Sequence, residues 1–275
     1  WDNYLPGYST MKEKERVVFF LRDGLSAAEK ERMAAYGADM NKYLDSGNEA
    51  RIKKAYESRD PRLQMAVITP YAQYNGASSG IAHTYTLRWP YRGSDSAEPF
   101  DIRTDTNDKF YYLWRKFVPE GLEQTERDTY GLDIPLIRYA EVLLLKAEAL
   151  NEWGSTHESE AIRCVNEVRR RAGHVELNNA TYPATKVNGQ SDLRERIRNE
   201  YYWEIGGEDS MYFHELRWGT WKDKKFDNNR NGLMQMWGET TYTWYWLGDQ
   251  CWSWPIPAKE MEMNSNLEQN EGWIN

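Results

Sequence analysis

The side chains of this sequence that are best suited to chemistry are aromatic rings set among amides, carboxylates and guanidinium groups. The chain holds 13 Trp and 19 Tyr beside only 7 Phe. Trp and Tyr combine an apolar ring with a polar group, and they are favoured where one side of the ring is apolar and the other is wet. Their excess over Phe therefore indicates surfaces that bind a ligand, although packing in a helical core accounts for many of the rings individually.

Two stretches place such rings beside polar side chains, one at the start of the chain and one between residues 71 and 92. A sugar ring presents C–H faces that pack on Trp and Tyr, while its hydroxyl groups need polar partners, so this mixture suits a glycan. For each ring, packing beneath a loop is the alternative interpretation. The candidate ligand-binding residues are Trp1, Asn3, Tyr4, Tyr74, Asn75, Trp89, Tyr91 and Arg92.

A third stretch reproduces the first half of a calcium-binding loop. Asp227, Asn229 and Asn231 supply oxygen atoms at positions one, three and five, and a glycine follows for the turn. The bidentate carboxylate that should stand at position twelve is missing, because that position is Gly238. We interpret the stretch as a polar turn, with a calcium site as the weaker alternative, and the sequence indicates no other cofactor.

Patterns that would indicate catalysis are weak. The four histidines show no metal-binding spacing, and no nucleophile elbow, phosphate-binding loop or dinucleotide fingerprint is present. Among 43 Asp and Glu, two that could serve as the acid and base of a glycosidase are easily found, but the sequence gives no separation between them. We therefore expect a binding protein and not an enzyme.

Helices and long loops must position these side chains. A capping box at residues 26–29 begins a helix that runs to about Leu44, and a shorter helix fits residues 49–57. Helical periodicity disappears between residues 69 and 108, where we expect long loops with short strands, and residues 110–117 favour an extended segment.

Periodicity returns strongly after residue 137. Apolar residues recur at three- and four-residue spacing from Ile137 to Leu150 and again from Ala161 to Ala172. Gly154 ends the first of these helices, and a glycine at position 173 ends the second, which predicts an antiparallel helical hairpin. A third helix begins at residues 191–192 and reaches at least residue 202.

Composition limits the classes of partner. A net charge of −8 without a basic face argues against nucleic acid. The longest apolar runs are too short to cross a bilayer, and the chain begins at Trp1 without a charged-then-apolar leader. We expect any export signal or lipid anchor to lie outside this chain. Cys164 falls among apolar helix positions, which favours a small buried residue over a disulfide with Cys251.

Several stretches, taken in order, resemble the SusD/RagB family. They are DPRL at 60–63, DIPLIRYAEVLL at 133–144, VNEVRRRAG at 165–173, WPIP at 254–257 and QNEGW at 269–273. The resemblance implies a mainly α fold of tetratricopeptide-like helical hairpins, with long irregular loops and a few short strands. Residues 1–275 would then form the C-terminal domain of a longer protein, whose N-terminal portion and lipid anchor are absent from this chain.

The resemblance also implies a function. Members of the family are lipoproteins on the extracellular face of a bacterial outer membrane, where they hold an oligosaccharide or polysaccharide for a TonB-dependent SusC-like transporter. The RagB branch holds peptides. Ligand sites in the family draw on loops that precede the helix near Arg138, which favours the two aromatic stretches named first. We expect glycan capture, with a peptide-binding lid and a helical glycoside hydrolase as the alternatives.

Overall fold

The computed structural model describes residues 59–69, 72–78, 80–87, 100, 113–121, 133–208, 210–225, 246 and 248–273. Within them, helices dominate and the strands are short, as the sequence predicts. The α-helices and strands are α4 (Pro61–Ala66), β1 (Val67–Ile68), β2 (Gln73–Ser78), β3 (Ile81–Thr86), β4 (Leu113–Trp114), α5 (Tyr139–Trp153), α6 (Glu158–Arg171), α7 (Gln190–Glu204), α8 (Ser210–Arg217), α9 (Trp221–Lys225) and α10 (Ala258–Met263). Short 3₁₀ helices cover Ser155–His157, Pro183–Thr185 and Asp249–Trp252.

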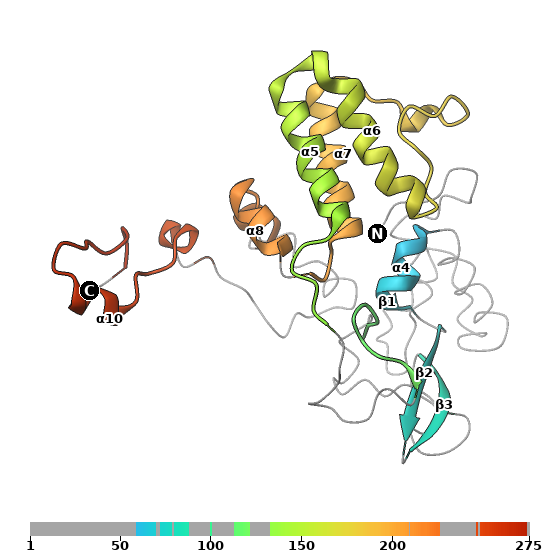
Figure 1. The fold of residues 1–275 in the computed structure, drawn as a ribbon, viewed down its shortest axis with the longest axis horizontal. Coiled ribbons are helices and arrows are strands. Elements are labelled where there is room, and N and C mark those ends of the chain that lie inside the picture. Colours follow the sequence, from blue (N-terminus) through green and yellow to red (C-terminus); the bar gives the residue numbers. More distant parts are fainter. Residues whose placement is uncertain are drawn as a thin grey trace, which may run out of the picture. The chain divides into compact units, whose positions relative to one another are not determined.

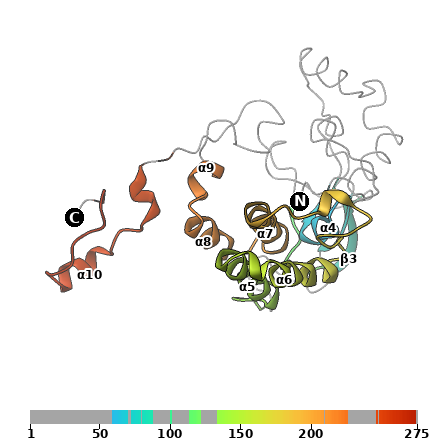
Figure 2. The same cartoon turned by 90° about the horizontal axis from the view of Figure 1, so that it is seen from above.

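Helices α5, α6 and α7 pack side by side and contain most of the core (Figures 1 and 2). Their fully buried side chains recur at helical spacing, because each helix turns one apolar stripe toward the other two. Those side chains include Leu144, Ala147, Ala161, Val165, Leu193, Ile197 and Tyr201, each with 0% of its surface exposed. Burial of a large apolar side chain contributes about 1.5–3 kcal/mol, so this group stabilises the three helices strongly.

The ends of the paired helices follow from local sequence. Gly154 adopts φ 141° after α5, and Gly173 adopts φ 71° after α6, which are conformations that favour glycine. Helix α6 also carries Glu158 and Glu160 in its first turn and three arginines in its last turn, which complements the helix dipole. The predicted antiparallel hairpin is therefore confirmed, although α5 begins at Tyr139, and Ile137 lies before it and is exposed.

One small antiparallel sheet lies in the stretch where helical periodicity disappears, and the two strands of a second lie before and after it. Strand β1 pairs with β4, and β2 pairs with β3 from Gln73 opposite Thr86 to Ser78 opposite Ile81. The hairpin β2–β3 is visible as the pair of arrows in Figure 1. Short strands within 69–108 and an extended segment within 110–117 are thus confirmed for the residues that the structure describes.

The chain divides into two compact units, residues 1–208 and residues 209–275. The second unit contains α8, α9, α10 and the 3₁₀ helix Asp249–Trp252. Both cysteines are free thiols, and Cys164 is buried as expected, so that burial raises the pKa of its thiol. Among the described residues, no helix is long and apolar enough to span a membrane.

Candidate functional site

The hairpin β2–β3 carries the two predicted ligand residues that the structure describes, and it has two unlike faces. Directly opposite residues in an antiparallel pair share a face, and neighbours along a strand alternate. Tyr74 therefore lies on one face with Tyr85 and His83, to which Phe100 adds a ring 4.1 Å from that of His83 and 5.6 Å from that of Tyr85. We call these four residues the aromatic face.

Gly76 gives the aromatic face its shape. A Cβ atom at this position would lie 2.8 Å from Cε2 of Tyr85 and 3.0 Å from its Cδ2, which is too close for a real contact. The absence of a side chain lets the Tyr85 ring lean across β2, where it is 9% exposed. The glycine is thus required by ring packing and not by an unusual backbone angle.

The opposite face of the hairpin is polar. Asn75 and Thr84 face each other across the two strands, and the Thr84 hydroxyl donates to Oδ1 of Asn75 over 3.3 Å. Both side chains are exposed. Because Tyr74 and Asn75 are adjacent on one strand, their side chains lie on opposite faces. A flat ligand that stacks on the aromatic face therefore cannot also lie against the amide of Asn75.

A loop at residues 115–120, which we call the supporting loop, holds β2 in place. The Tyr74 hydroxyl donates to the Pro119 carbonyl over 2.8 Å. Burial, and secondly the nearby Glu120 carboxylate, raise the pKa of the Tyr74 phenol, so the hydroxyl stays protonated as this hydrogen bond requires. Arg115 and Glu120 form an ion pair beside the strand, and each also contacts the backbone of β2.

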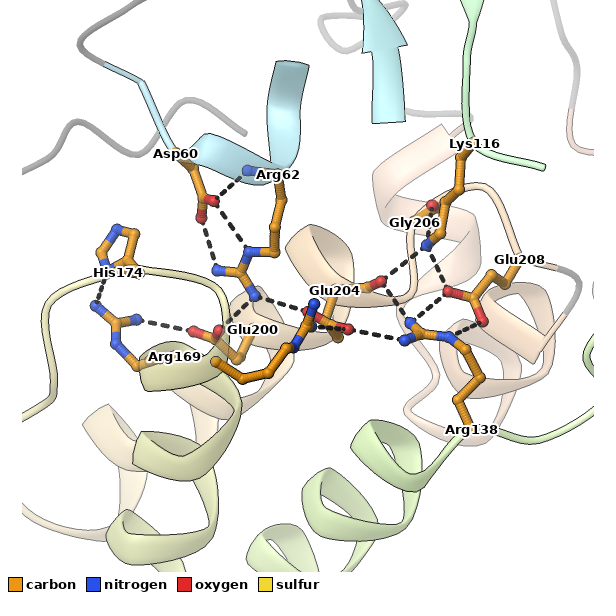
Figure 3. A network of polar contacts seen from close by, with 11 residues as sticks. Asp60, Arg62, Lys116, Arg138, Arg169, His174, Glu200, Glu204, Gly206 and Glu208 are labelled. Atoms are coloured by element: carbon orange, nitrogen blue, oxygen red, sulfur yellow. Dashed lines mark hydrogen bonds and ion pairs between the residues drawn. The ribbon is translucent and has the colours of Figure 1, made fainter. Parts of the chain in front are cut away.

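Lys116 fastens the supporting loop to the end of α7 (Figure 3). Its ammonium group donates to the backbone carbonyls of Glu204 over 2.9 Å and Gly206 over 3.3 Å, and it forms an ion pair with Glu208. Burial lowers the pKa of Lys116, and the Glu208 carboxylate opposes that shift. Arg138, which precedes α5, donates to Glu204 and Glu208 from the other side.

Glu200 is the centre of a wider charged network that joins three segments far apart in the sequence (Figure 3). It is 0% exposed, and its two oxygens accept from Arg62 over 2.7 Å and from Arg169 over 2.8 Å. Asp60 caps α4 and accepts two further bonds from Arg62, which hold the pKa of its carboxyl below the ordinary value although burial acts against this. Arg169 also contacts His174 over 2.8 Å.

These charges are structural in character. A buried carboxylate needs cationic partners, because an uncompensated charge in the interior is costly. Asp60, Glu200 and Glu204 each have at least one arginine within hydrogen-bond distance. These bonds join the acids to arginines and not to residues of the aromatic face. We find among the described residues no group of three or more His, Cys, Asp or Glu arranged to hold a metal ion.

The second unit carries aromatic clusters of its own. Trp254, which is 71% exposed, donates its indole N–H to the Tyr212 hydroxyl over 3.3 Å, and Trp221 meets the Tyr212 ring edge-on. Trp246 packs at 5.0 Å from Trp252. Trp246 and Trp252 therefore pack on each other, whereas Trp254 contacts Tyr212 and stays largely exposed.

The other predicted site residues lie outside the described part of the chain. They are Trp1, Asn3, Tyr4, Trp89, Tyr91 and Arg92, and the calcium-loop candidates Asp227, Asn229 and Asn231. The two early helices predicted at 26–44 and 49–57 lie outside it as well. Their roles stay predictions. Three residues that sequence reasoning missed lie against the hairpin: Phe100, Arg115 and Glu120. No spacing signal could have found them, because Phe100 and the supporting loop are both separated from the hairpin in the sequence.

Comparison with known proteins places the chain among relatives of one kind. The family model described as the SusD family matches residues 18–273. The chain is 32% identical over 139 residues to the SusD-like protein P38 of Formosa agariphila, which is 50% of this chain and 24% of that protein. It is 28% identical over 161 residues to the starch-binding protein SusD of Bacteroides thetaiotaomicron, covering 58% of this chain and 25% of that protein.

A solved structure shares the fold. A SusD-like protein from Bacteroides fragilis superposes with a TM-score of 0.56 at 20% sequence identity, over 94% of this chain and 46% of that one. The matched part thus spans about a quarter of the curated relatives and less than half of the solved structure.

Proposed function

This chain belongs to the SusD/RagB family, and from that premise we propose that it is the glycan-binding component of a bacterial outer-membrane polysaccharide uptake system. In this role it holds an oligosaccharide on the extracellular face of the membrane for a TonB-dependent SusC-like transporter. The observation that carries the proposal is the family match over residues 18–273. A relative named as starch-binding supports the class of ligand.

The aromatic face of β2–β3 is the part of the described structure that best fits a sugar. It presents the rings of Tyr74, His83 and Phe100, each of which is partly exposed, and rings of this kind can stack on a sugar. The predicted residues Trp89, Tyr91 and Arg92 follow β3 closely in the sequence. We propose that the glycan stacks on this face and that polar groups of the same loops bind its hydroxyls.

The proposed activity is binding without turnover. Two of the buried acids, Glu200 and Glu204, are engaged by arginines, which leaves neither placed as an acid or base for a bound sugar. Assays for release of reducing sugar from the polysaccharide that binds would test this directly, since a helical glycoside hydrolase would release it and the proposed protein would not.

The proposal is tested by a glycan-array screen followed by calorimetry on the best ligand, with the unmodified chain and with Trp89→Ala. We expect Trp89→Ala to weaken binding about tenfold or more, because it removes one stacking ring. The matched control is Trp153→Ala. Trp153 is 77% exposed at the end of α5, where it stacks on His157 at a centroid distance of 4.5 Å.

The outcomes separate the possibilities. Loss of affinity in Trp89→Ala with retention in Trp153→Ala would support a platform next to β3. Equal loss in both variants would contradict a localised site. Failure of the folded, unmodified chain to bind any glycan, with capture of peptides instead, would overturn the proposal in favour of the peptide-binding lid.

A further inference from the structure

The backbone groups on the outer edge of β2 point away from β3 at alternate residues. In an antiparallel pair, residues alternate between positions whose backbone groups bond across the pair and positions whose groups point away from it. Leu87 donates its backbone N–H to the Ala72 carbonyl over 3.1 Å, so that pair is bonded across the hairpin. The backbone N–H and C=O groups of the next pair, Gln73 and Thr86, must then point away from the hairpin, and so must those of Asn75 and Thr84.

The edge of β3 confirms this alternation. The N–H of Thr86 donates to the carbonyl of Phe100 over 3.1 Å, away from β2 and toward a segment outside the hairpin. The outward N–H of Thr86 is therefore satisfied by backbone, in the way that one strand satisfies its neighbour. Among the described residues, no strand pairs with the opposite edge, that of β2.

Side chains take the place of a strand at the edge of β2. The guanidinium group of Arg115 donates from Nη1 to the Gln73 carbonyl over 3.3 Å. The carboxylate of Glu120 accepts from the backbone N–H of Asn75 over 3.2 Å through Oε2. The same two side chains bond to each other from Nε of Arg115 to Oε1 of Glu120. The guanidinium donor thus faces a backbone carbonyl of the strand, and the carboxylate acceptor faces a backbone N–H.

We propose that the Arg115–Glu120 pair closes the edge of β2 against a third strand and is the specificity-determining feature of the hairpin, excluding extended peptide from it. Exposed strand edges add strands from other chains readily, and proteins commonly guard them with charged side chains. This pair goes further than charge alone, because its hydrogen bonds match the polarity of the backbone groups. An incoming strand would have to break both.

This role extends the proposed function. It rests on that function only in taking the ligand of the hairpin to be a sugar. An oligosaccharide can stack on the aromatic face without touching the edge. An extended peptide gains most of its affinity from backbone hydrogen bonds to an open edge. A closed edge beside a partly exposed aromatic face would therefore select sugar over peptide on the same hairpin.

The test uses strand capture and involves no glycan. The probe is a fluorescein-labelled octapeptide of alternating threonine and valine, and its binding is followed by fluorescence anisotropy. Light scattering of the protein alone measures edge-to-edge dimers. We expect the double variant Arg115→Ala with Glu120→Ala to bind the peptide at least about tenfold more tightly than the unmodified chain, or to dimerise, because two backbone groups are freed.

Two controls sharpen the test. The double variant Arg194→Ala with Glu152→Ala removes another half-exposed, hydrogen-bonded pair that lies on helices and not on a strand edge, and it should capture nothing. The exchange Arg115→Glu with Glu120→Arg keeps the charges but opposes carboxylate to carbonyl and guanidinium to N–H. It should capture peptide like the alanine variant.

Each outcome of the capture experiment either supports or overturns the proposal. Capture by the alanine and exchanged variants, with none by the unmodified chain or the helical control, supports the proposal. Capture by the unmodified chain overturns it, as does absence of capture in an alanine variant whose circular dichroism shows intact helices. Should that variant unfold, Glu120→Ala alone, which frees only the Asn75 N–H, must show weaker capture in the same direction, and the absence of any capture there overturns the proposal. Failure of the glycan screen leaves these outcomes unaffected.

Discussion

The three-helix core and the β2–β3 hairpin are held in place by different means. The helices α5, α6 and α7 share side chains with no exposed surface, and buried acids at their ends are bonded to several arginines each. The hairpin is joined to the rest of the described structure by single hydrogen bonds from the supporting loop and by the ring and backbone carbonyl of Phe100. On its polar face, Asn75 and Thr84 are exposed.

This difference separates stability from recognition. Removing a group from the helical core leaves a cavity or an unpaired charge, which is among the most destabilising changes that a protein can undergo. If the hairpin binds the ligand as proposed, changing it should alter the surface that the ligand meets and should cost less stability. Lys116 connects the two regions, because it holds the supporting loop to the end of α7. This separation of roles would be wrong if variants of the core changed the affinity for glycan while the chain stayed folded, or if variants of the hairpin unfolded the protein.

The largest effect is expected from Glu200→Ala. The change leaves Arg62 and Arg169 buried without their shared carboxylate, and breaking a buried ion pair in this way costs about 3–5 kcal/mol. Urea unfolding measures the loss. The matched control is Glu195→Ala on the same helix, whose side chain is 61% exposed and which should change stability by no more than about 0.5 kcal/mol. Equal losses in the two variants would contradict a buried network.

A smaller effect on stability, with a larger one on binding, is expected from Gly76→Ala. The new Cβ would press on the Tyr85 ring, and such overpacking costs about 1–3 kcal/mol. Because the ring must move, we expect glycan affinity to fall in calorimetry. Gly80→Ala is the control, since Gly80 has φ 78° but a Cβ there meets nothing within 4 Å. It should lower stability through backbone strain and leave affinity unchanged. Loss of affinity in both variants would show that general loosening of the hairpin is the cause.

The helical core could be predicted from the sequence, and the candidate binding surface only in part. Periodic apolar residues and terminal glycines such as Gly154 are local signals, so α5, α6 and α7 were recognisable. The burial of Arg169 was not, because an arginine in a charged run is exposed unless a distant acid such as Glu200 meets it. Tyr74 and Asn75 were predicted as ligand residues from composition, but their placement on opposite faces required the strand that carries them.

The smallest effect is a dependence of stability on pH that belongs to the core. Burial, followed by the nearby Arg169 guanidinium, lowers the pKa of His174 from its ordinary value of 6.5, and the charges of Asp60 and Glu200 only partly oppose this. The imidazole is therefore neutral in the folded chain at pH values where the unfolded chain already binds a proton. Its contribution to stability is complete above about pH 6.5 and decreases as the pH falls below that value, by at most about 1.4 kcal/mol per pH unit, until the folded form is protonated too.

Urea unfolding between pH 8 and pH 5.5 would measure this decrease, above the range in which Asp60 and Glu208 begin to titrate in the unfolded chain. His174→Gln removes the titrating group while its amide can still accept a hydrogen bond from Arg169, so the slope should flatten in this variant. A slope that persists in His174→Gln would place the pH dependence elsewhere. A loss of glycan affinity over the same range, in chains that remain folded, would show that the core and the hairpin are less independent than their contacts indicate.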